Sequence, residues 1–221
     1  MNVAALHRSE VEHGLTEHEL LQVRTNEVRF VYVPYRRYLT VDGQDEPGGP
    51  SFRRAIAALY PVAYALHFAL KARGVVAPVG SLEGTYWIGS RGPMPAEAFS
   101  RRGTAERMDW RLMIAIPDQA TDDEIAGAMI AVEAKSGTAA TGLLRWDGWL
   151  EGECAQTLHV GDYDAEGPTI ARLNDAITGA GFRPRGCHHE IYLSGPSTAP
   201  ERTRTIIRQP IEEAEWWTDN G

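Results

Sequence analysis

Residues 186–193 have the sequence Gly186-Cys187-His188-His189-Glu190-Ile191-Tyr192-Leu193, and a Ser-Gly-Pro turn follows them. The leading glycine, the closing turn and the β-favouring Ile191 and Tyr192 predict a β-strand. Side chains alternate between the two faces of a strand. One face is therefore expected to carry His188, Glu190 and Tyr192, and the other face Cys187, His189, Ile191 and Leu193.

The carboxylate of Glu190 lies between an imidazole and a phenol on its face of this strand. A charged group in mid-strand is costly to bury without a partner. Two interpretations follow. The segment is either an edge strand with a solvated polar face, or the floor of a ligand pocket centred on Glu190.

The composition bounds the class of protein. The chain has 221 residues, 43% of them hydrophobic and 24% charged, which is typical of a soluble globular protein with one substantial domain or two small fused ones. The formal net charge of -8 argues against nucleic acid and against an anionic membrane surface as partners. We expect no direct contact with either.

The cysteines and the terminus bear on location. Cys154 and Cys187 are the two cysteines, and their wide spacing forms no disulfide framework. No apolar run approaches membrane-spanning length, and the N-terminus lacks the regions of a signal peptide. The expected location is a reducing cytoplasm. No phosphate-binding G-x-x-x-x-G-K loop is present, and no cofactor is expected.

The first part of the chain predicts a strand, a helix and two further strands. A strand is expected over 28–41, and helical spacing starts at Ser51 and stops at Gly74, with Pro61 inside it. Residues 81–88 and 108–116 predict an antiparallel pair joined by a mobile loop, Gly89 to Thr104. Residues 1–27 predict an N-terminal arm with a capping box at Thr16–Glu19 and modest packing.

The second part repeats this order after an extra helix that follows a capping box at 121–124. A strand is expected over about 149–160, and then a helix N-capped by Asp164. The strand that contains Glu190 and a last strand over about 203–211 complete the second part. Residues 212–221 form an acidic tail with Trp216 and Trp217.

The repeated order predicts an α+β fold. Two pseudo-repeated strand–helix–strand–strand modules, about 28–117 and 149–211, would form antiparallel sheets in one domain spanning 28–211. Glu83 and Glu190 fall in the same strand of each half. If a pseudo-twofold axis relates the halves, both strands face a central groove, which is the natural ligand cleft.

Three runs of residues resemble the GyrI-like small-molecule-binding family, and more narrowly its stand-alone bacterial branch. They are Cys154 to Asp164, His188 to Ser194, and Thr198 to Pro210. Tyr38 to Gly43 and Leu82-Glu83-Gly84 fit more weakly. The resemblance covers about residues 28–211.

The resemblance implies a duplicated strand–helix–strand–strand fold with a cleft for hydrophobic, often aromatic and sometimes cationic compounds. It places the family's central glutamate at Glu190. Relatives include effector domains of multidrug-responsive regulators, a gyrase inhibitor and, in the stand-alone branch, hydrolases of cyclopropanoid genotoxins. This chain departs from the regulators because it shows no helix-turn-helix motif and no basic face.

Glu190 is the principal candidate for chemistry. Desolvation in an aromatic cleft should raise its pKa toward the range of a general base. The same charge would hold a cationic drug in a protein that only binds. Tyr192, Tyr60 or Tyr64 could donate a hydrogen bond to a developing phenolate, and His188 and His159 are weaker candidates.

Other candidates would line the groove. Two interpretations of Glu83 are open. It either supplies a second carboxylate in the groove, or it pairs with an arginine or lies outside the groove. Flat apolar area is offered by Tyr86, Trp87 and Trp110, for which core packing is the alternative. Tyr60, Tyr64 and His67 form a helical stripe that is either core or pocket wall.

No metal site is expected, because Cys187, His188, His189 and Glu190 alternate between faces and cannot converge on one ion. Three functions remain open. The first is detoxification or self-protection by a hydrolase that opens cyclopropane rings. The second is sequestration of drugs without turnover, and the third is inhibition of a topoisomerase. The chain is expected to be a monomer or a homodimer.

Overall fold

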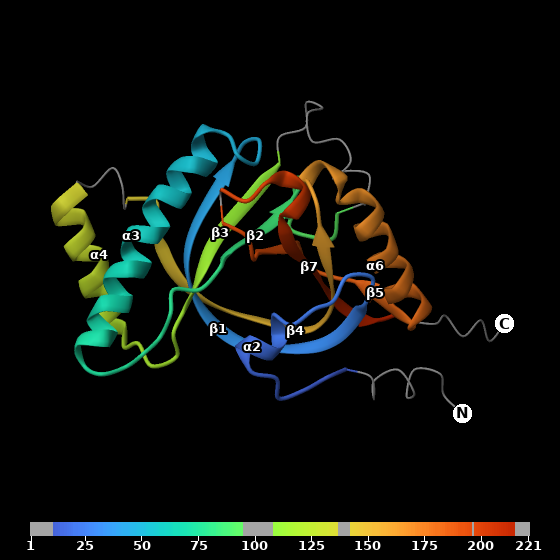
Figure 1. Cartoon of the computed structure of the whole chain (residues 1–221), viewed down its shortest axis with the longest axis horizontal. Helices are drawn as coiled ribbons and strands as arrows, with labels where there is room; N and C mark the ends of the chain where they lie inside the picture. The colour runs from blue at the N-terminus through green and yellow to red at the C-terminus, as the bar shows by residue number, and fades with distance from the viewer. Residues whose placement is uncertain (1–10, 95–107, 137–141, 196, 215–221) are drawn as a thin grey trace.

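The computed structural model describes residues 11–94, 108–136, 142–195 and 197–214 (Figure 1). The first half consists of β1 (Val28–Gln44), α3 (Pro50–Ala72), β2 (Leu82–Trp87) and β3 (Asp109–Ile116). The second half repeats the order with β4 (Arg145–Val160), α6 (Gly167–Gly179), β6 (His188–Tyr192) and β7 (Arg204–Glu213). The additional elements are α2 (Glu17–Leu20), α4 (Asp122–Ser136), η3 (Tyr163–Ala165), β5 (Phe182–Pro184) and η4 (Pro200–Arg202).

The predicted α+β class and the repeated strand–helix–strand–strand order are confirmed. The two halves share a single antiparallel seven-stranded sheet with the order β4-β1-β3-β2-β6-β7-β5. An additional pairing between β4 and β7 connects the two sides of this sheet into a ring of strands. The ring has an inner face, which the strands enclose, and an outer face.

β2 of the first half pairs with β6 of the second half, and Gly84 lies directly opposite Glu190 in this register. β7 covers the other edge of β6. The interpretation of residues 186–193 as a solvated edge strand is therefore wrong. Glu190 is also 0% exposed.

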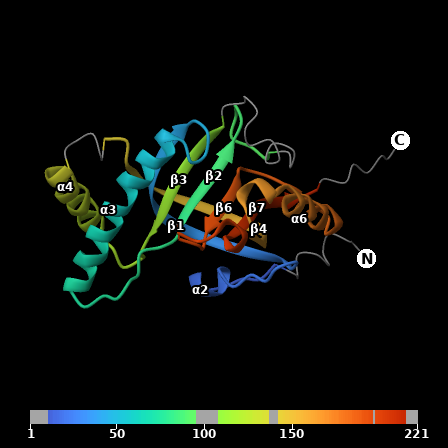
Figure 2. The same cartoon turned by 45° about the horizontal axis from the view of Figure 1, so that its top comes forward.

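Both long helices pack on the outer face of the ring. α3 packs against β1 and β3, and α6 packs against β4 and β5. Figure 2 shows β2, β6 and β7 between the two helices. Leu59 of α3, Leu173 of α6 and Ile207 of β7 belong to one hydrophobic core. The two halves of the chain pair at β2–β6, on the midline between the helices, and also at β1–β4.

α3 is long and apolar enough to cross a membrane by length and composition alone, with a mean hydropathy of 1.3 in its most apolar window. The expectation that no apolar run approaches membrane-spanning length is therefore wrong for this segment. Its buried side chains, among them Leu59, Val62, Leu66 and Leu70, pack in the core. The apolar composition is thus that of a core helix.

Strand β4 changes its inward-facing set of side chains at Gly152. Both Glu151 and Gln156 bind the guanidinium of Arg208, at 3.0 and 2.9 Å. Residues five apart on a regular strand point to opposite faces. Gly152 has a φ of 75°, a conformation that glycine adopts at little cost, and it interrupts the alternation between them.

The N-terminal segment, residues 11–27, packs on the inner face more closely than expected. Leu20 is 2% exposed and Val23 is 5% exposed. Leu20 packs with Val31, Val33 and Cys154. The predicted capping box at Thr16 and Glu19 is confirmed. Modest packing was therefore the wrong expectation for these residues.

Two expected boundaries in the second half are also wrong. β4 starts at Arg145 rather than near 149, because its first residues pair with β1. Asp164 does not cap a helix. The 3₁₀ turn η3 comes first, and the Asp162 side chain caps it by accepting a hydrogen bond from the Asp164 amide. α6 then begins at Gly167 without a side-chain cap.

Replacement of Leu20 by alanine tests whether the N-terminal segment is part of the core. We expect the free energy of unfolding to fall by about 2–5 kcal/mol, because a buried leucine leaves a cavity. Leu150→Ala is the matched control, since Leu150 is 53% exposed and its loss should cost less than about 0.5 kcal/mol. Urea unfolding measures both. Equal losses would show that residues 11–27 are not integral to the fold.

Candidate functional site

Two side chains of β6 and one of β2 gather around Glu190 on the outer face. The hydroxyl of Tyr192 donates to Oε2 of Glu190 at 2.7 Å. Nε2 of His188 lies 3.4 Å from Oε1 of the same carboxylate. The hydroxyl of Tyr86 contacts the hydroxyl of Tyr192. A chain of two phenols therefore leads to a buried carboxylate, and an imidazole flanks its other oxygen. We call Tyr86, His188, Glu190 and Tyr192 the outer cluster.

Gly84 makes room for the outer cluster. It faces Glu190 across the β2–β6 pair. A Cβ atom at this position would lie 2.8 Å from the Tyr86 hydroxyl oxygen and 3.0 Å from its ring. Tyr86 itself is 0% exposed. The absence of a side chain at Gly84 thus allows the Tyr86 ring to reach Tyr192.

One further aromatic ring contacts this cluster, and two more tyrosines lie on α3. The ring of Tyr163, in η3, makes an edge contact with Tyr192 at 5.7 Å between centroids. On α3, Tyr60 and Tyr64 are 6.2 Å apart. They share a side of the helix with His67, whose Nδ1 contacts the carbonyl of Ala77 in the segment leading to β2. Tyr60 and Tyr64 therefore lie on the side of α3 toward β2, and partial burial raises the pKa of Tyr60.

Neither Trp87 nor Trp110 is a member of the outer cluster. Trp110 is 1% exposed, makes an edge contact with Phe52 and lies over Gly43, where a Cβ would be 2.2 Å from the indole. Of the two roles considered for Trp110, groove lining and core packing, the structure shows core packing. Trp87 lies one position beyond Tyr86 on β2 and hence on the opposite face, where Arg91 stacks on it at 4.5 Å.

His159 has a structural position. Its Nε2 lies 3.0 Å from the carbonyl of Asp162, and its Nδ1 lies 3.1 Å from the hydroxyl of Thr169. A carbonyl only accepts hydrogen bonds, so Nε2 carries a proton and His159 holds η3 against α6. Within residues 11–94, 108–136, 142–195 and 197–214, no three His, Cys, Asp or Glu side chains gather as metal ligands would.

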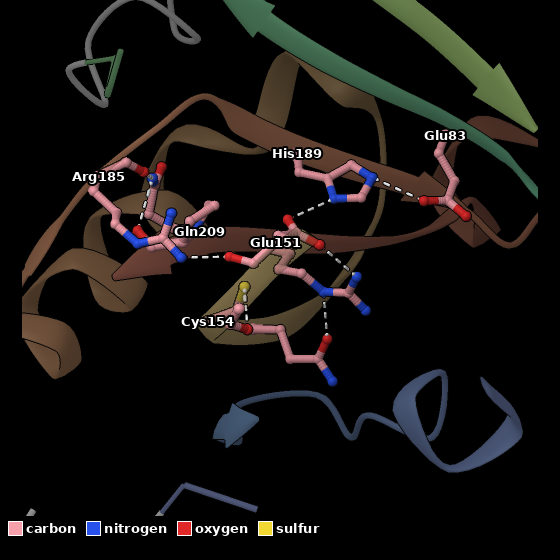
Figure 3. Close-up of polar contacts among 10 residues, drawn as sticks. Glu83, Glu151, Cys154, Arg185, His189 and Gln209 are labelled. Atoms are coloured by element: carbon pink, nitrogen blue, oxygen red, sulfur yellow. Dashed lines mark hydrogen bonds and ion pairs between the residues drawn. The ribbon is translucent and has the colours of Figure 1, made fainter. Parts of the chain in front are cut away.

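The structure does not bring Glu83 to Glu190. Glu83 lies on the inner face, where its Oε2 is 2.9 Å from Nε2 of His189 (Figure 3). The other nitrogen of His189 is 2.8 Å from Oε1 of Glu151. Glu151 also pairs with Arg208 at 3.0 Å. We call Glu83, Glu151, His189 and Arg208 the inner network.

The inner network was not predicted from the sequence, where the partner considered for Glu83 was an arginine rather than His189. The signal available was the odd-numbered position of His189, which predicts that it faces away from Glu190. The partners Glu151 and Arg208 come from β4 and β7. No local pattern in those strands indicates that their side chains meet His189.

The charges of the inner network stabilise one another. Burial alone would raise the pKa of Glu151, but His189 and Arg208 outweigh burial and lower this pKa to about 2. Burial alone would lower the pKa of His189, but Glu151 and Glu83 outweigh it and raise this pKa to about 9. His189 is therefore an imidazolium at neutral pH, bound on both nitrogens by carboxylates.

Known protein structures share this fold. A protein-family scan and a search of curated proteins give no match. A crystal structure of an uncharacterized conserved protein from Listeria innocua is 26% identical, covering 89% of this chain and 97% of that one, with a TM-score of 0.77. A hydrolase from the same organism is 26% identical over 89% of this chain and 97% of its own, with a TM-score of 0.72.

The C-terminal domain of EcmrR is a more distant structural neighbour. It is 13% identical, covers 85% of this chain and 98% of that domain, and has a TM-score of 0.52. At this identity the likeness concerns the fold alone. The duplicated α+β architecture agrees with the fold that the GyrI-like resemblance implies.

Gly84→Ala tests the packing of the outer cluster. We expect a loss of about 1–3 kcal/mol in the free energy of unfolding, because the new methyl group forces the buried Tyr86 ring away from Tyr192. Gly80→Ala is the control, since a Cβ there meets Ala115 at an ordinary 3.6 Å. Urea unfolding compares the two. A Gly84→Ala protein as stable as the Gly80→Ala protein would contradict the close packing around Tyr86.

The inner network predicts a pH dependence of stability with two limbs. The Glu151 contribution is complete above pH 4.5 and is lost as the pH falls through about 2. The His189 contribution is complete below pH 6.5 and is lost as the pH rises through about 9. Urea unfolding across pH should thus show a decline between pH 6.5 and 9. This decline should be weaker in His189→Gln, and an unchanged decline would assign it to other groups.

Proposed function

We propose that this protein is a hydrolase that adds water to hydrophobic, cyclopropane-bearing genotoxins at Glu190. The observation that carries the proposal is the state of Glu190: its side chain is 0% exposed, and Tyr192 donates to it at 2.7 Å. It lies where the two halves of the chain meet, between the helices. Such a carboxylate is held in one orientation and shielded from bulk water, as a general base requires.

The burial of Glu190 separates the enzyme from an open drug-binding groove. A protein that sequesters cations in a wide, open groove would present the carboxylate to bulk water. Here Glu190 is buried in the strand pair, and the hydroxyl of Tyr192 fixes one of its oxygens. A general base needs this orientation, because proton transfer depends on the position of the accepting oxygen.

The proposed reaction assigns a proton path to the outer cluster. Water attacks a cyclopropyl carbon of a ring that is conjugated to a dienone, while Oε1 of Glu190 takes a proton from that water. The cyclopropane C–C bond breaks, and its electron pair enters the dienone, which becomes a phenolate. The phenolate oxygen then takes up the proton, so that the product is the substrate plus one water. Tyr192 keeps Glu190 oriented, and Tyr86 orders Tyr192.

The phenolate that develops during the reaction needs a hydrogen-bond donor. Tyr192 already donates to Glu190, so that its proton is committed in this state. Tyr60 and Tyr64, on the side of α3 toward β2, are the remaining phenols of the candidate set. Their hydroxyls supply the donor in this proposal. Tyr163, which touches Tyr192, adds apolar surface for an aromatic substrate.

The comparisons support the class of reaction. A crystal structure described as a hydrolase from Listeria innocua is 26% identical over 89% of this chain, with a TM-score of 0.74. The comparisons do not specify the bond that is hydrolysed. Our choice of a cyclopropane ring rests on the chemistry of the outer cluster and on the GyrI-like resemblance. A cytoplasmic location and a role in self-protection are parts of the same proposal.

A second candidate is a protein that binds drugs without turnover. One observation favours it: a buried carboxylate surrounded by the rings of Tyr86, Tyr163 and Tyr192 is also a site for a lipophilic cation. Residues 95–104 of the expected 89–104 loop, and Trp216 and Trp217 of the tail, lie outside the described residues. Inhibition of a topoisomerase stays a prediction.

The test is mass-spectrometric. The purified protein is incubated with a spirocyclopropyl-dienone compound, and the product heavier by one water is quantified. We expect turnover by the native protein and a loss of about 10²–10⁴-fold in Glu190→Gln, the usual contribution of a general base. Glu133→Gln, which removes an exposed carboxylate of α4, is the control and should retain turnover.

Each outcome assigns a function. Turnover that Glu190→Gln leaves unchanged would keep the hydrolase and remove Glu190 from the role of base. Binding of the compound without any turnover, even in the native protein, would overturn the hydrolase in favour of the drug-binding protein. If the compound is neither bound nor turned over, this substrate class is excluded.

A further inference from the structure

His189 and Glu190 are adjacent on β6 and point to opposite faces of the sheet. Their Cα atoms are about 3.8 Å apart, the distance across any trans peptide. Both side chains are 0% exposed. Two consecutive residues of the strand thus carry a buried carboxylate on the outer face and a buried imidazolium on the inner face. Water cannot screen either charge effectively at this depth.

His189 has little freedom to move. Its two nitrogens are held at 2.8 Å by Glu151 and at 2.9 Å by Glu83. The ring of Trp149 lies 5.3 Å from its own ring. These partners come from β2 and β4, so that two neighbouring elements fix the orientation of an imidazole carried by β6. Because β6 is short, holding His189 also holds Glu190, the next residue.

The inner network is balanced in charge. It contains two carboxylates, Glu83 and Glu151, and two cations, the imidazolium of His189 and the guanidinium of Arg208. Gln156 extends it by accepting from Arg208 and donating to the carbonyl of Leu20 in the N-terminal segment. Leu20 is itself buried, so that the segment covers the network on the inner face.

We propose that the inner network is a positioning device for Glu190, in which His189 orients β6 and its charge balance keeps the outer carboxylate ionised at neutral pH. This inference rests on the proposed function, because it takes Glu190 as the working carboxylate. His189 touches no substrate in it and acts only through β6 and through its charge. A network of the same shape with an excess of negative charge would disfavour the ionised form of Glu190.

The groups that can influence this balance come from every element packed around the pair. On the inner face, Tyr38 of β1 and Cys154 of β4 are buried beside the network, and burial raises the pKa of both. Arg36 lies near Glu83 and Tyr38. On the outer face, Tyr86, His188 and Tyr192 lie at the carboxylate, and Tyr163 contacts Tyr192. His159 is bound between η3 and α6, Glu166 is buried, and Tyr60 and Tyr64 lie on α3. The variants below leave all of these unchanged.

The experiment uses two variants that separate charge from shape. His189→Gln removes one cation and leaves the network with an excess negative charge. The double variant His189→Gln/Glu83→Gln lacks the same ion pair but is balanced again, with Glu151 and Arg208 remaining. The full-length protein is labelled with ¹³C at the glutamate carboxyl carbons, and comparison with Glu190→Gln assigns the signal of Glu190. No ligand or turnover is needed.

We expect the titration midpoint of Glu190 to rise by about one pH unit in His189→Gln, the usual size of a nearby-charge effect. The double variant should return it close to the native midpoint, although both variants should unfold at lower urea concentrations. If His189→Gln does not fold, Arg208→Gln creates the same imbalance, and Arg208→Gln/Glu151→Gln restores it.

An unchanged midpoint in His189→Gln would overturn the proposal. A midpoint shifted equally in the single and the double variant would also overturn it, because the network would then act through packing alone. The result is independent of turnover, so that a failed hydrolase test and a failed positioning test are distinguishable.

Discussion

The pairing of β2 with β6 is the interaction on which the rest of the structure depends. It is where the two strand–helix–strand–strand halves are joined edge to edge within one sheet. The halves are joined a second time by β1 and β4, and the pairing of β4 with β7 within the second half closes the ring around an interior that the N-terminal segment covers. A sheet joined twice has few free edges. The same closure forces polar residues of β6 into buried positions on both faces.

Burying charge on both faces of one short strand is expensive, and the two faces meet this cost differently. The inner face carries opposite charges that pair directly and leave a neutral set. A buried ion pair of this kind adds little net stability, but breaking it by removing one partner is strongly destabilising. The outer face carries a carboxylate with a phenol and an imidazole. This asymmetry suits a structural role inside the ring and a chemical role outside it.

The fold alone does not decide between binding and catalysis, because one architecture can support both. The relevant features are local to the outer cluster. Gly84 permits the approach of Tyr86, Tyr86 contacts Tyr192, and Tyr192 orients one oxygen of Glu190. A carboxylate held in this way is suited to take a proton from a defined direction. A loosely held carboxylate would bind a cation equally well.

The sequence by itself determined the α+β class, the repeated order of elements and the face that Glu190 shares with His188 and Tyr192. These follow from local periodicity, turn residues and strand alternation, which need no knowledge of distant contacts. The alternation also separated His189 from Glu190. The motif Leu82-Glu83-Gly84 was recognised, although the reason for its glycine was not.

Only the tertiary structure decided which strands became neighbours, and therefore which charges met. For Glu83 the sequence left open a second carboxylate in the groove, a pairing with an arginine or a position outside the groove; it pairs with His189, since its position on β2 places it on the inner face. Glu151 joins the same network because the positive φ of Gly152 shifts the alternation of β4, and a sequence pattern does not show such a shift. Trp110 is core because it packs over Gly43 of another strand. Contacts between residues far apart in the chain depend on register and closure, and the sequence encodes these only through the packing of the whole fold.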